Sequence, residues 1–269
     1  TLRKHVKNIE NTVVNYYYQT TKSFMLIQYL YGEDGADPRY LTRQELPTVK
    51  LSNDQLKEKY YYKATTSSLQ PIFDAEFKHL MEDRDKFRKI AFRLESIGLT
   101  NDYQTKLFFS IPLESMIFRY SKSKPKDEKK LHSMVQIVDK FVKEFPYFYI
   151  NDAQRAAKGF IPEYISSATF AICMLLRSYL TNKALSKMNK KMLKIMLNEI
   201  GIKFTASLIS PGSAVGIMAA QSVGEPMTQA MLDAIHGASS GSKAGLERSK
   251  EIVGAKPSSN ETNTMWFRL

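Results

Sequence analysis

The sequence has few of the features that mark membrane proteins or proteins held together by disulfides. It contains one cysteine, Cys173, so no disulfide can form within the chain, which is typical of a reducing compartment. Cys173 lies in the apolar run AICMLL, which favours a buried, inert thiol over a nucleophile. No uninterrupted apolar stretch approaches the roughly 20 residues that span a bilayer, and the N-terminus shows no signal-peptide pattern. These absences favour a protein that has no membrane span.

Acidic residues are scarce compared with basic ones. The chain has 27 Asp and Glu against 39 Lys and Arg, a formal net charge of +12. This surplus favours an anionic partner, and nucleic acid is the usual one for an intracellular chain, although excess lysine can also serve solubility alone. The 269 residues are 43% hydrophobic, enough for one large core or two smaller ones, so the chain is not a disordered tail.

The sequence offers no nucleophile triad and no metal-ligand cluster, which disfavours a self-contained hydrolase. The acidic residues of Gly32–Pro38 (GEDGADP) match neither an EF-hand loop nor a two-carboxylate nuclease site. Glycine and proline around acidic residues are typical of turns, so we expect a structural turn at this point.

Apolar residues at helical spacing predict a mainly α fold. We expect helices over residues 54–61, 71–94, 131–145, 164–180 and 182–200. Residues 164–180 are apolar on most faces and are predicted to be the most buried helix, and Gly201 is a plausible C-cap of the last one. The charged stretch 121–130 is predicted to be an exposed linker, and 263–269 a short C-terminal β strand.

The stretch 211–256 has the most specific pattern in the chain. Its first apolar run is interrupted by Gly224-Glu225-Pro226, where proline removes a backbone donor, so we expect one helix to end near Val223. Residues 237–245 (GASSGSKAG) are predicted to be a mobile tip, and 246–252 a second helical piece. Two helical arms joined by such a tip form a hairpin that can fold against a neighbour or swing away.

The first arm of this hairpin places four side chains on one face. Gln229, Leu232, Asp233 and His236 follow the spacing i, i+3, i+4 and i+7. A single histidine on a helix is more often part of a core than of a site. The glycine- and serine-rich tip that follows argues against a helix packed permanently in a core.

These residues carry a resemblance to a known family. The run AVGIMAAQSVGEPMTQAMLDAIHG, followed by GLERSKEIVGAK, resembles the trigger-loop region of the largest subunit of multisubunit DNA-dependent RNA polymerases. The run IQYLYGEDGAD is similar to the segment that follows the bridge helix in that family. The order of segments is closest to the eukaryotic and large-DNA-virus branch, and the middle of the chain matches more loosely than its ends.

The resemblance implies three regions. Residues 1–45 would hold the end of the bridge helix and the YGEDG segment, and 46–205 a helical foot- or cleft-like region. Residues 206–269 would hold the trigger-loop hairpin with its flanking helix and strand. The implied fold is a mainly α, multi-helix segment of a polymerase largest subunit, with a mobile helical hairpin and a short C-terminal β strand.

The resemblance also implies roles for the four hairpin residues. His236 would lie near the incoming triphosphate, where an imidazole can donate a hydrogen bond or a proton to the leaving phosphate. Gln229 would contact the ribose, and Leu232 would cap the base. Asp233 departs from the family, in which arginine or asparagine is common at this position. Its role is therefore expected to differ, because an ionised aspartate only accepts hydrogen bonds and repels phosphate. Either the site is rotated, or Asp233 accepts from ribose hydroxyls or a basic neighbour.

The opening of the chain carries the candidate nucleic-acid contacts. An apolar stripe at Leu2, Val6, Ile9 and Val13 lies opposite three cations, Arg3, Lys4 and Lys7. Taken alone, this pattern is typical of a surface helix with solvated cations. By resemblance, Arg3 and Lys4 match basic residues near the end of the bridge helix that lie against the template strand. Such phosphate contacts would be independent of sequence and sensitive to salt.

Other parts of the enzyme are implied as well. The family's aspartate motif similar to NADFDGD is absent, so Mg²⁺ would be held by another part of the polymerase, and this chain alone is expected to be inactive. The implied partners are the rest of the largest subunit, the second-largest subunit, smaller subunits, the DNA template, the RNA product and the NTP substrate. The implied location is intracellular: cytoplasm or virion for a viral protein, nucleus for a cellular one.

A second hypothesis is a non-catalytic, basic helical module that binds nucleic acid or a partner protein. It accounts for the charge but not for the spacing of Gln229, Leu232 and His236 before a flexible tip. The chain begins with Thr1 rather than methionine, which is compatible with a processed product or with part of something longer.

Overall fold

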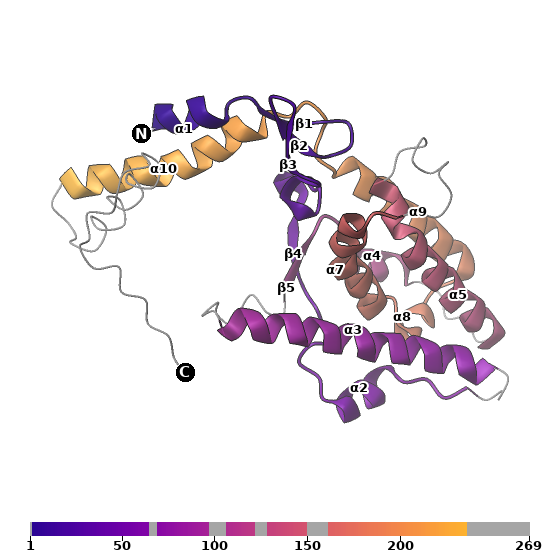
Figure 1. The fold of residues 1–269 in the computed structure, drawn as a ribbon. Helices are drawn as coiled ribbons and strands as arrows, with labels where there is room; N and C mark the ends of the chain where they lie inside the picture. The colour runs from indigo at the N-terminus through magenta and orange to yellow at the C-terminus, as the bar shows by residue number, and fades with distance from the viewer. Residues whose placement is uncertain (1, 65–68, 97–105, 122–127, 150–160, 236–269) are drawn as a thin grey trace. The chain divides into compact units, whose positions relative to one another are not determined.

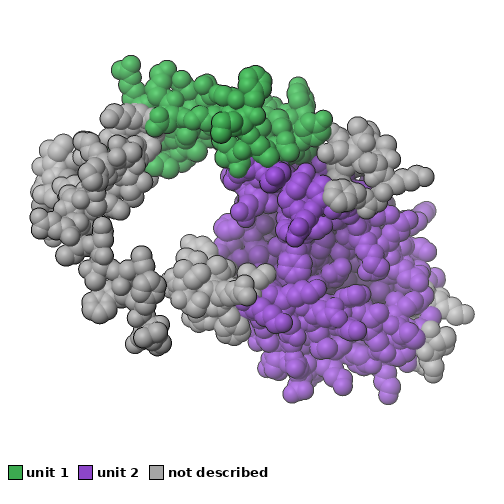
Figure 2. Space-filling model, in the orientation of Figure 1, with its two compact units in different colours: residues 1–27, 211–269 green, residues 28–210 purple. Residues whose placement is uncertain are grey.

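The structure is a computed structural model that describes residues 2–64, 69–96, 106–121, 128–149 and 161–235 (Figure 1). Within these ranges the fold is mainly α, as the sequence predicted. The chain divides into two compact units, one of residues 28–210 and one that combines residues 1–27 with 211–269 (Figure 2). The predicted hairpin tip, the helical piece at 246–252 and the strand at 263–269 all lie outside the described residues.

The unit of residues 28–210 is a set of helices around one core. Its helices are α2 (Asn53–Tyr60), α3 (Gln70–Ser96), α4 (Leu113–Tyr120), α5 (Glu128–Glu144), α7 (Glu163–Tyr179), α8 (Asn182–Leu185) and α9 (Lys190–Ala206). Shorter 3-10 turns are η1 (Tyr31–Glu33), η2 (Pro38–Tyr40) and η5 (Phe145–Tyr149). The helices predicted over 54–61, 71–94, 131–145 and 164–180 are confirmed as α2, α3, α5 and α7. Residues 122–127 of the predicted linker at 121–130 lie outside the described residues, and the prediction is wrong for 128–130, which form the start of α5.

Helix α7 lies at the centre of this unit. It packs against α3, α4 and α5, and it buries Ile165, Ile172, Met174, Leu175 and Leu176. An aromatic cluster continues the core toward α9, with the rings of Phe145 and Phe204 separated by 4.7 Å between centroids. Cys173 of α7 is half-buried, and burial raises the pKa of its thiol to about 11, which disfavours the reactive thiolate.

The helix predicted over 182–200 is wrong in two respects. The chain forms α8 and α9 instead, separated by a turn that buries Met188 completely. Gly201 is not a C-cap, because α9 continues to Ala206. Gly201 is needed inside the helix for packing, since a Cβ at this position would lie 2.8 Å from Cζ of Phe148. Contacts from another part of the chain therefore override the local signal.

The acidic segment Gly32–Pro38, which overlaps η1, is a turn, as predicted. Gly32 and Gly35 both have positive φ angles, 58° and 65°. Asp37 is 2% exposed and accepts hydrogen bonds from the backbone N–H and the guanidinium of Arg39, which hold the pKa of Asp37 below its usual range. No group of three or more His, Cys, Asp or Glu that could hold a metal ion occurs among the described residues. None of the described helices is long and apolar enough to cross a membrane.

Short strands in both units were not predicted. In the larger unit, β4 (Thr42–Glu45) pairs antiparallel with β5 (Lys106–Phe109). The other sheet has the order β1 (Thr12–Val14), β2 (Thr20–Lys22), β3 (Met25–Gln28), with β1 and β2 antiparallel. The first helix, α1 (Leu2–Ile9), is therefore shorter than the apolar stripe suggested, and Val13 belongs to β1.

In the unit that joins the two ends of the sequence, α1 packs along α10 (Val215–Ile235) (Figure 1). The buried positions of α10 include Gly216, Ala220 and Gly224, which recur every four residues and form a stripe of small side chains. The approach is closest at Gly216, where a Cβ would lie only 1.8 Å from the carbonyl oxygen of Ile9. The backbones of the two helices can come this close only because Gly216 has no side chain.

The predicted helix end near Val223 is also wrong, because α10 runs through Gly224-Glu225-Pro226 to Ile235. Gly224 is buried, which is consistent with its place in the small-residue stripe. Pro226 cannot donate to the carbonyl of Ser222, but Ser222 is exposed, so water can bind that carbonyl. Packing along one face keeps a helix intact despite a local cost of about 3 kcal/mol for an interior proline.

Gly216→Ala is expected to separate α1 from α10 and to lower the melting temperature of the protein, because the added methyl group collides with backbone rather than with a movable side chain. Ala219→Ser is the control, since Ala219 is an exposed position of the same helix. Thermal unfolding followed by circular dichroism measures both. Equal melting temperatures for Gly216→Ala and the unsubstituted protein would contradict the close approach.

Glu76 of α3 is a half-buried carboxylate whose pKa differs from its usual value. It lies in a cavity of about 300 Å³ between α3, α5 and α7, and it accepts a hydrogen bond of 2.5 Å from the side-chain amide of Asn182. Burial raises the pKa of Glu76 to about 7, and Asp139 adds to the rise.

Because the folded state keeps this proton up to about pH 7 while the unfolded state releases it near pH 4.5, Glu76 lowers stability progressively between these values. Glu76→Gln keeps the acceptor for Asn182 and is expected to become more stable than the unsubstituted protein as the pH rises through this window. Melting temperatures across the window measure the effect, with exposed Glu58→Gln as control. A difference that does not change with pH would show that Glu76 is not held protonated.

Candidate functional site

The structure brings the two groups of predicted site residues into one unit. Arg3, Lys4 and Lys7 lie on α1, and Gln229, Leu232 and Asp233 lie on α10, the helix against which α1 packs. The structure describes the side chains of Arg3, Lys7 and Gln229, but only the backbone of Lys4, Leu232 and Asp233. His236 lies outside the described residues.

The cations of α1 are on the surface. Arg3 and Lys7 are both exposed. Lys7 lies 3.2 Å from a carboxylate oxygen of Glu10, an exposed pair of the kind that contributes little to stability. Arg3 has no carboxylate partner among the described residues. Both side chains are therefore placed where an anion from outside the chain can reach them.

A lysine from β2 lies at the C-terminal end of α1, and sequence reasoning missed it. Nζ of Lys22 in β2 donates a hydrogen bond of 2.6 Å to the carbonyl of Asn8. A cation at this end of a helix satisfies a free carbonyl and complements the helix dipole. The β hairpin that follows α1 places Lys22 here, and no local pattern in the sequence indicates that return.

A short backbone ladder connects the start of α10 to the strand that follows α1. The N–H of Val14 donates to the carbonyl of Ser213 at 3.2 Å, and the N–H of Gly212 donates to the carbonyl of Val14 at 2.7 Å. Gly212 has a φ angle of 83°, which a residue with a Cβ rarely adopts. The ladder therefore holds the first turn of α10 beside the end of α1.

Gln229 is turned away from α1. Gln229 lies five positions after buried Gly224, and at about 100° per residue this places it about 140° around the helix axis. Its side chain is exposed. The face of α10 that packs on α1 and the face that carries Gln229 are thus different sides of one helix. The amide of Gln229 is available to hydrogen-bond a group that the described residues do not supply.

The chemistry of this helix pair is that of a binding surface. It presents exposed cations, which attract anions, and an exposed amide, which can donate and accept hydrogen bonds. Among the described residues of the unit, Glu10 is paired with Lys7, and Glu225 is exposed. Exposed groups of this kind are suited to contacts with an anionic or polar ligand.

Comparisons with known proteins identify the family. The sequence model described as RNA polymerase Rpb1, domain 5, matches residues 1–268. The chain is 35% identical over 275 residues to proteins named DNA-directed RNA polymerase RPB1 homolog from African swine fever virus, isolate Tick/Malawi/Lil 20-1/1983 and strain Badajoz 1971 Vero-adapted. Each alignment covers 99% of this chain and 19% of the relative, so the chain spans about a fifth of the length of these relatives. Since the match extends over almost every residue, the chain belongs to the RNA polymerase Rpb1, domain 5, family.

Proposed function

We propose that this chain is part of the active centre of a DNA-dependent RNA polymerase and that it closes over the incoming NTP during template-directed RNA synthesis. The observation that carries the proposal is the packing of α1 against α10, with Gln229 turned outward. The family and the names of the viral relatives support the general role in transcription.

In this proposal, α1 is the end of the bridge helix and α10 is the first arm of the trigger loop. The exposed cations of α1, together with Lys4, would contact phosphates of the template strand. The stripe of small residues gives α10 a fixed base along α1, beyond which the hairpin can move. A fixed base matters because closure has to deliver the substrate contacts to the same place in every cycle.

The substrate contacts would come from the outward face of α10 and from the residue after it. Gln229 would hydrogen-bond the ribose and Leu232 would cover the base. His236 would donate a hydrogen bond or a proton to the leaving phosphate. Asp233 would accept from the ribose hydroxyls or pair with a basic neighbour. Orientation of the substrate and exclusion of water on closure can lower a barrier by several kcal/mol.

Mg²⁺ would stabilise the charge of the triphosphate and would be held by another part of the polymerase. The proposed partners are the remainder of the largest subunit, the second-largest and smaller subunits, the DNA template and the RNA product. Since the relatives reported above are viral, cytoplasm or virion is the proposed location.

His236→Ala is expected to slow nucleotide addition by about tenfold or more while the complex still assembles, because general acid catalysis by one side chain typically contributes about 10²- to 10⁴-fold. The measurement is single-nucleotide extension at limiting NTP by a polymerase reconstituted with the full-length subunit. Normal extension by this variant would refute the role. A non-catalytic nucleic-acid- or protein-binding module, the alternative function, would be insensitive to the substitution.

Gln229→Ala is expected to reduce discrimination between ribose and deoxyribose substrates, because the amide that hydrogen-bonds the sugar is lost. The ratio of kcat/KM for an NTP to that for the matching dNTP measures the effect. Gln221→Ala is the matched control, since Gln221 is an exposed glutamine two turns earlier on the same helix. An equal fall in both variants would indicate a general disturbance of α10 rather than a sugar contact.

A further inference from the structure

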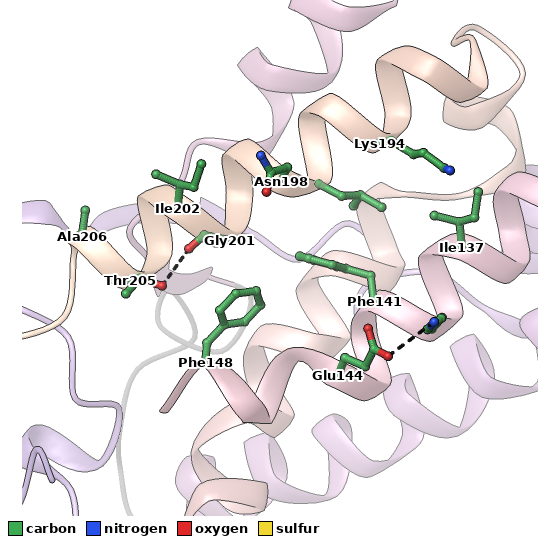
Figure 3. Close-up of a pocket in the computed structure, with 12 residues that line it drawn as sticks. Ile137, Phe141, Glu144, Phe148, Lys194, Asn198, Gly201, Ile202, Thr205 and Ala206 are labelled. Atoms are coloured by element: carbon green, nitrogen blue, oxygen red, sulfur yellow. Dashed lines mark hydrogen bonds and ion pairs between the residues drawn. The ribbon is translucent and has the colours of Figure 1, made fainter. Parts of the chain in front are cut away.

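An apolar groove runs between α5 and α9 in the unit of residues 28–210 (Figure 3). We call it the α5–α9 groove. Its volume is about 860 Å³, and its apolar lining comes from Ile137 and Phe141 of α5, Phe148 of η5, and Leu197 and Ile202 of α9. Ile202 is 62% exposed, so its side chain is open to contact from outside the chain.

The floor of the groove is held in shape by the core beneath it. The ring of Phe148 lies 5.3 Å from that of Phe145 and 6.1 Å from that of Phe141, between centroids. Phe145 is fully buried. Gly201 lets the ring of Phe148 lie directly against α9, because a Cβ at this position would be 2.8 Å from Cζ of that ring (Figure 3). The groove is therefore formed before anything binds in it.

Positive charge at one end of the groove is not neutralised. Lys194 lines the groove, and Lys190 and Lys191 lie one turn before it at the start of α9. None of the three has a carboxylate partner among the described residues, whereas other lysines of α5 and α9 are paired: Lys140 with Glu144, Lys143 with Asp139, and Lys203 with Glu199. The first turn of α9 has no acidic residue, so the positive end of the helix dipole adds to this charge.

We propose that the α5–α9 groove binds an amphipathic helix of a polypeptide segment outside this chain, with an apolar face on the groove floor and carboxylates against the lysines of α9. Both walls are helices whose backbone groups bond internally, so an occupant buried here has to satisfy its own backbone hydrogen bonds, as a helix does. The apolar floor offers little to a phosphate backbone, which favours a protein over a nucleic acid. Most of the length of the viral relatives lies outside the part that this chain matches, which leaves room for such a segment.

The test places a photo-crosslinking amino acid at position 202 or 195 of the full-length protein in its assembled complex. Ile195 is the matched control, because it is an isoleucine of the same helix, 53% exposed, that does not line the groove. Crosslinking is expected to be several-fold stronger from position 202, and mass spectrometry is expected to identify an acidic, amphipathic helical segment. Crosslinks to nucleic acid, crosslinks to a basic or extended segment, equal yields at the two positions, or no crosslink from position 202 would each overturn the proposal.

Charge reversal provides a second measurement in the same complex. Lys194→Glu is expected to reduce the crosslink from position 202 several-fold, while Lys86→Glu, at an exposed position of α3, leaves it unchanged. Replacement of the facing carboxylate by lysine is expected to restore the crosslink in the Lys194→Glu background. Both lysines are exposed, so the folded state tolerates the changes, and an unchanged crosslink in Lys194→Glu would exclude the role of charge.

Discussion

The contact between the backbones of α1 and α10 at Gly216 determines the arrangement of the candidate site. Helices usually keep their axes 8–10 Å apart because side chains separate them, and small residues allow a closer approach. Here the stripe of Gly216, Ala220 and Gly224 lets α10 lie directly on the carbonyl of Ile9. The opposite side of α10, which carries Gln229, consequently faces outward.

Two groups of exposed cations lie on different helices of the chain. Arg3 on α1 and the three lysines at the start of α9 are among the described cations that have no carboxylate partner among the described residues, whereas Lys140 and Lys203, for example, are paired. The two groups differ in their surroundings. Arg3 lies on a helix surface open to solvent, which suits a phosphate, whereas the α9 lysines border an apolar groove, which suits a carboxylate on a helix.

Sequence reasoning was most accurate where one local pattern decides the structure. The periodicity of α3, α5 and α7 and the glycines of the turn at 32–38 predicted the observed elements. It failed at Gly201 and Gly224, which were interpreted as the end of a helix and as part of a break. Gly201 instead allows a close contact with Phe148, and Gly224 is a buried position inside α10. Glycine is found both at helix ends and at packed positions inside helices, so its presence alone does not distinguish the two. The strands were missed because three or four residues are too few to show alternation.

The sequence by itself determined the mainly α character, the order of most helices, the resemblance at the two ends and the absence of a metal-binding motif. Each of these depends on neighbouring residues or on a fixed spacing. Only the tertiary structure decided that residues 2–9 lie along residues 215–235, that Lys22 reaches the end of α1, and that α5 and α9 leave a groove between them. These features depend on contacts between segments that are not neighbours in the chain, such as the approach of Gly216 to the carbonyl of Ile9, and no local pattern of residues records such contacts.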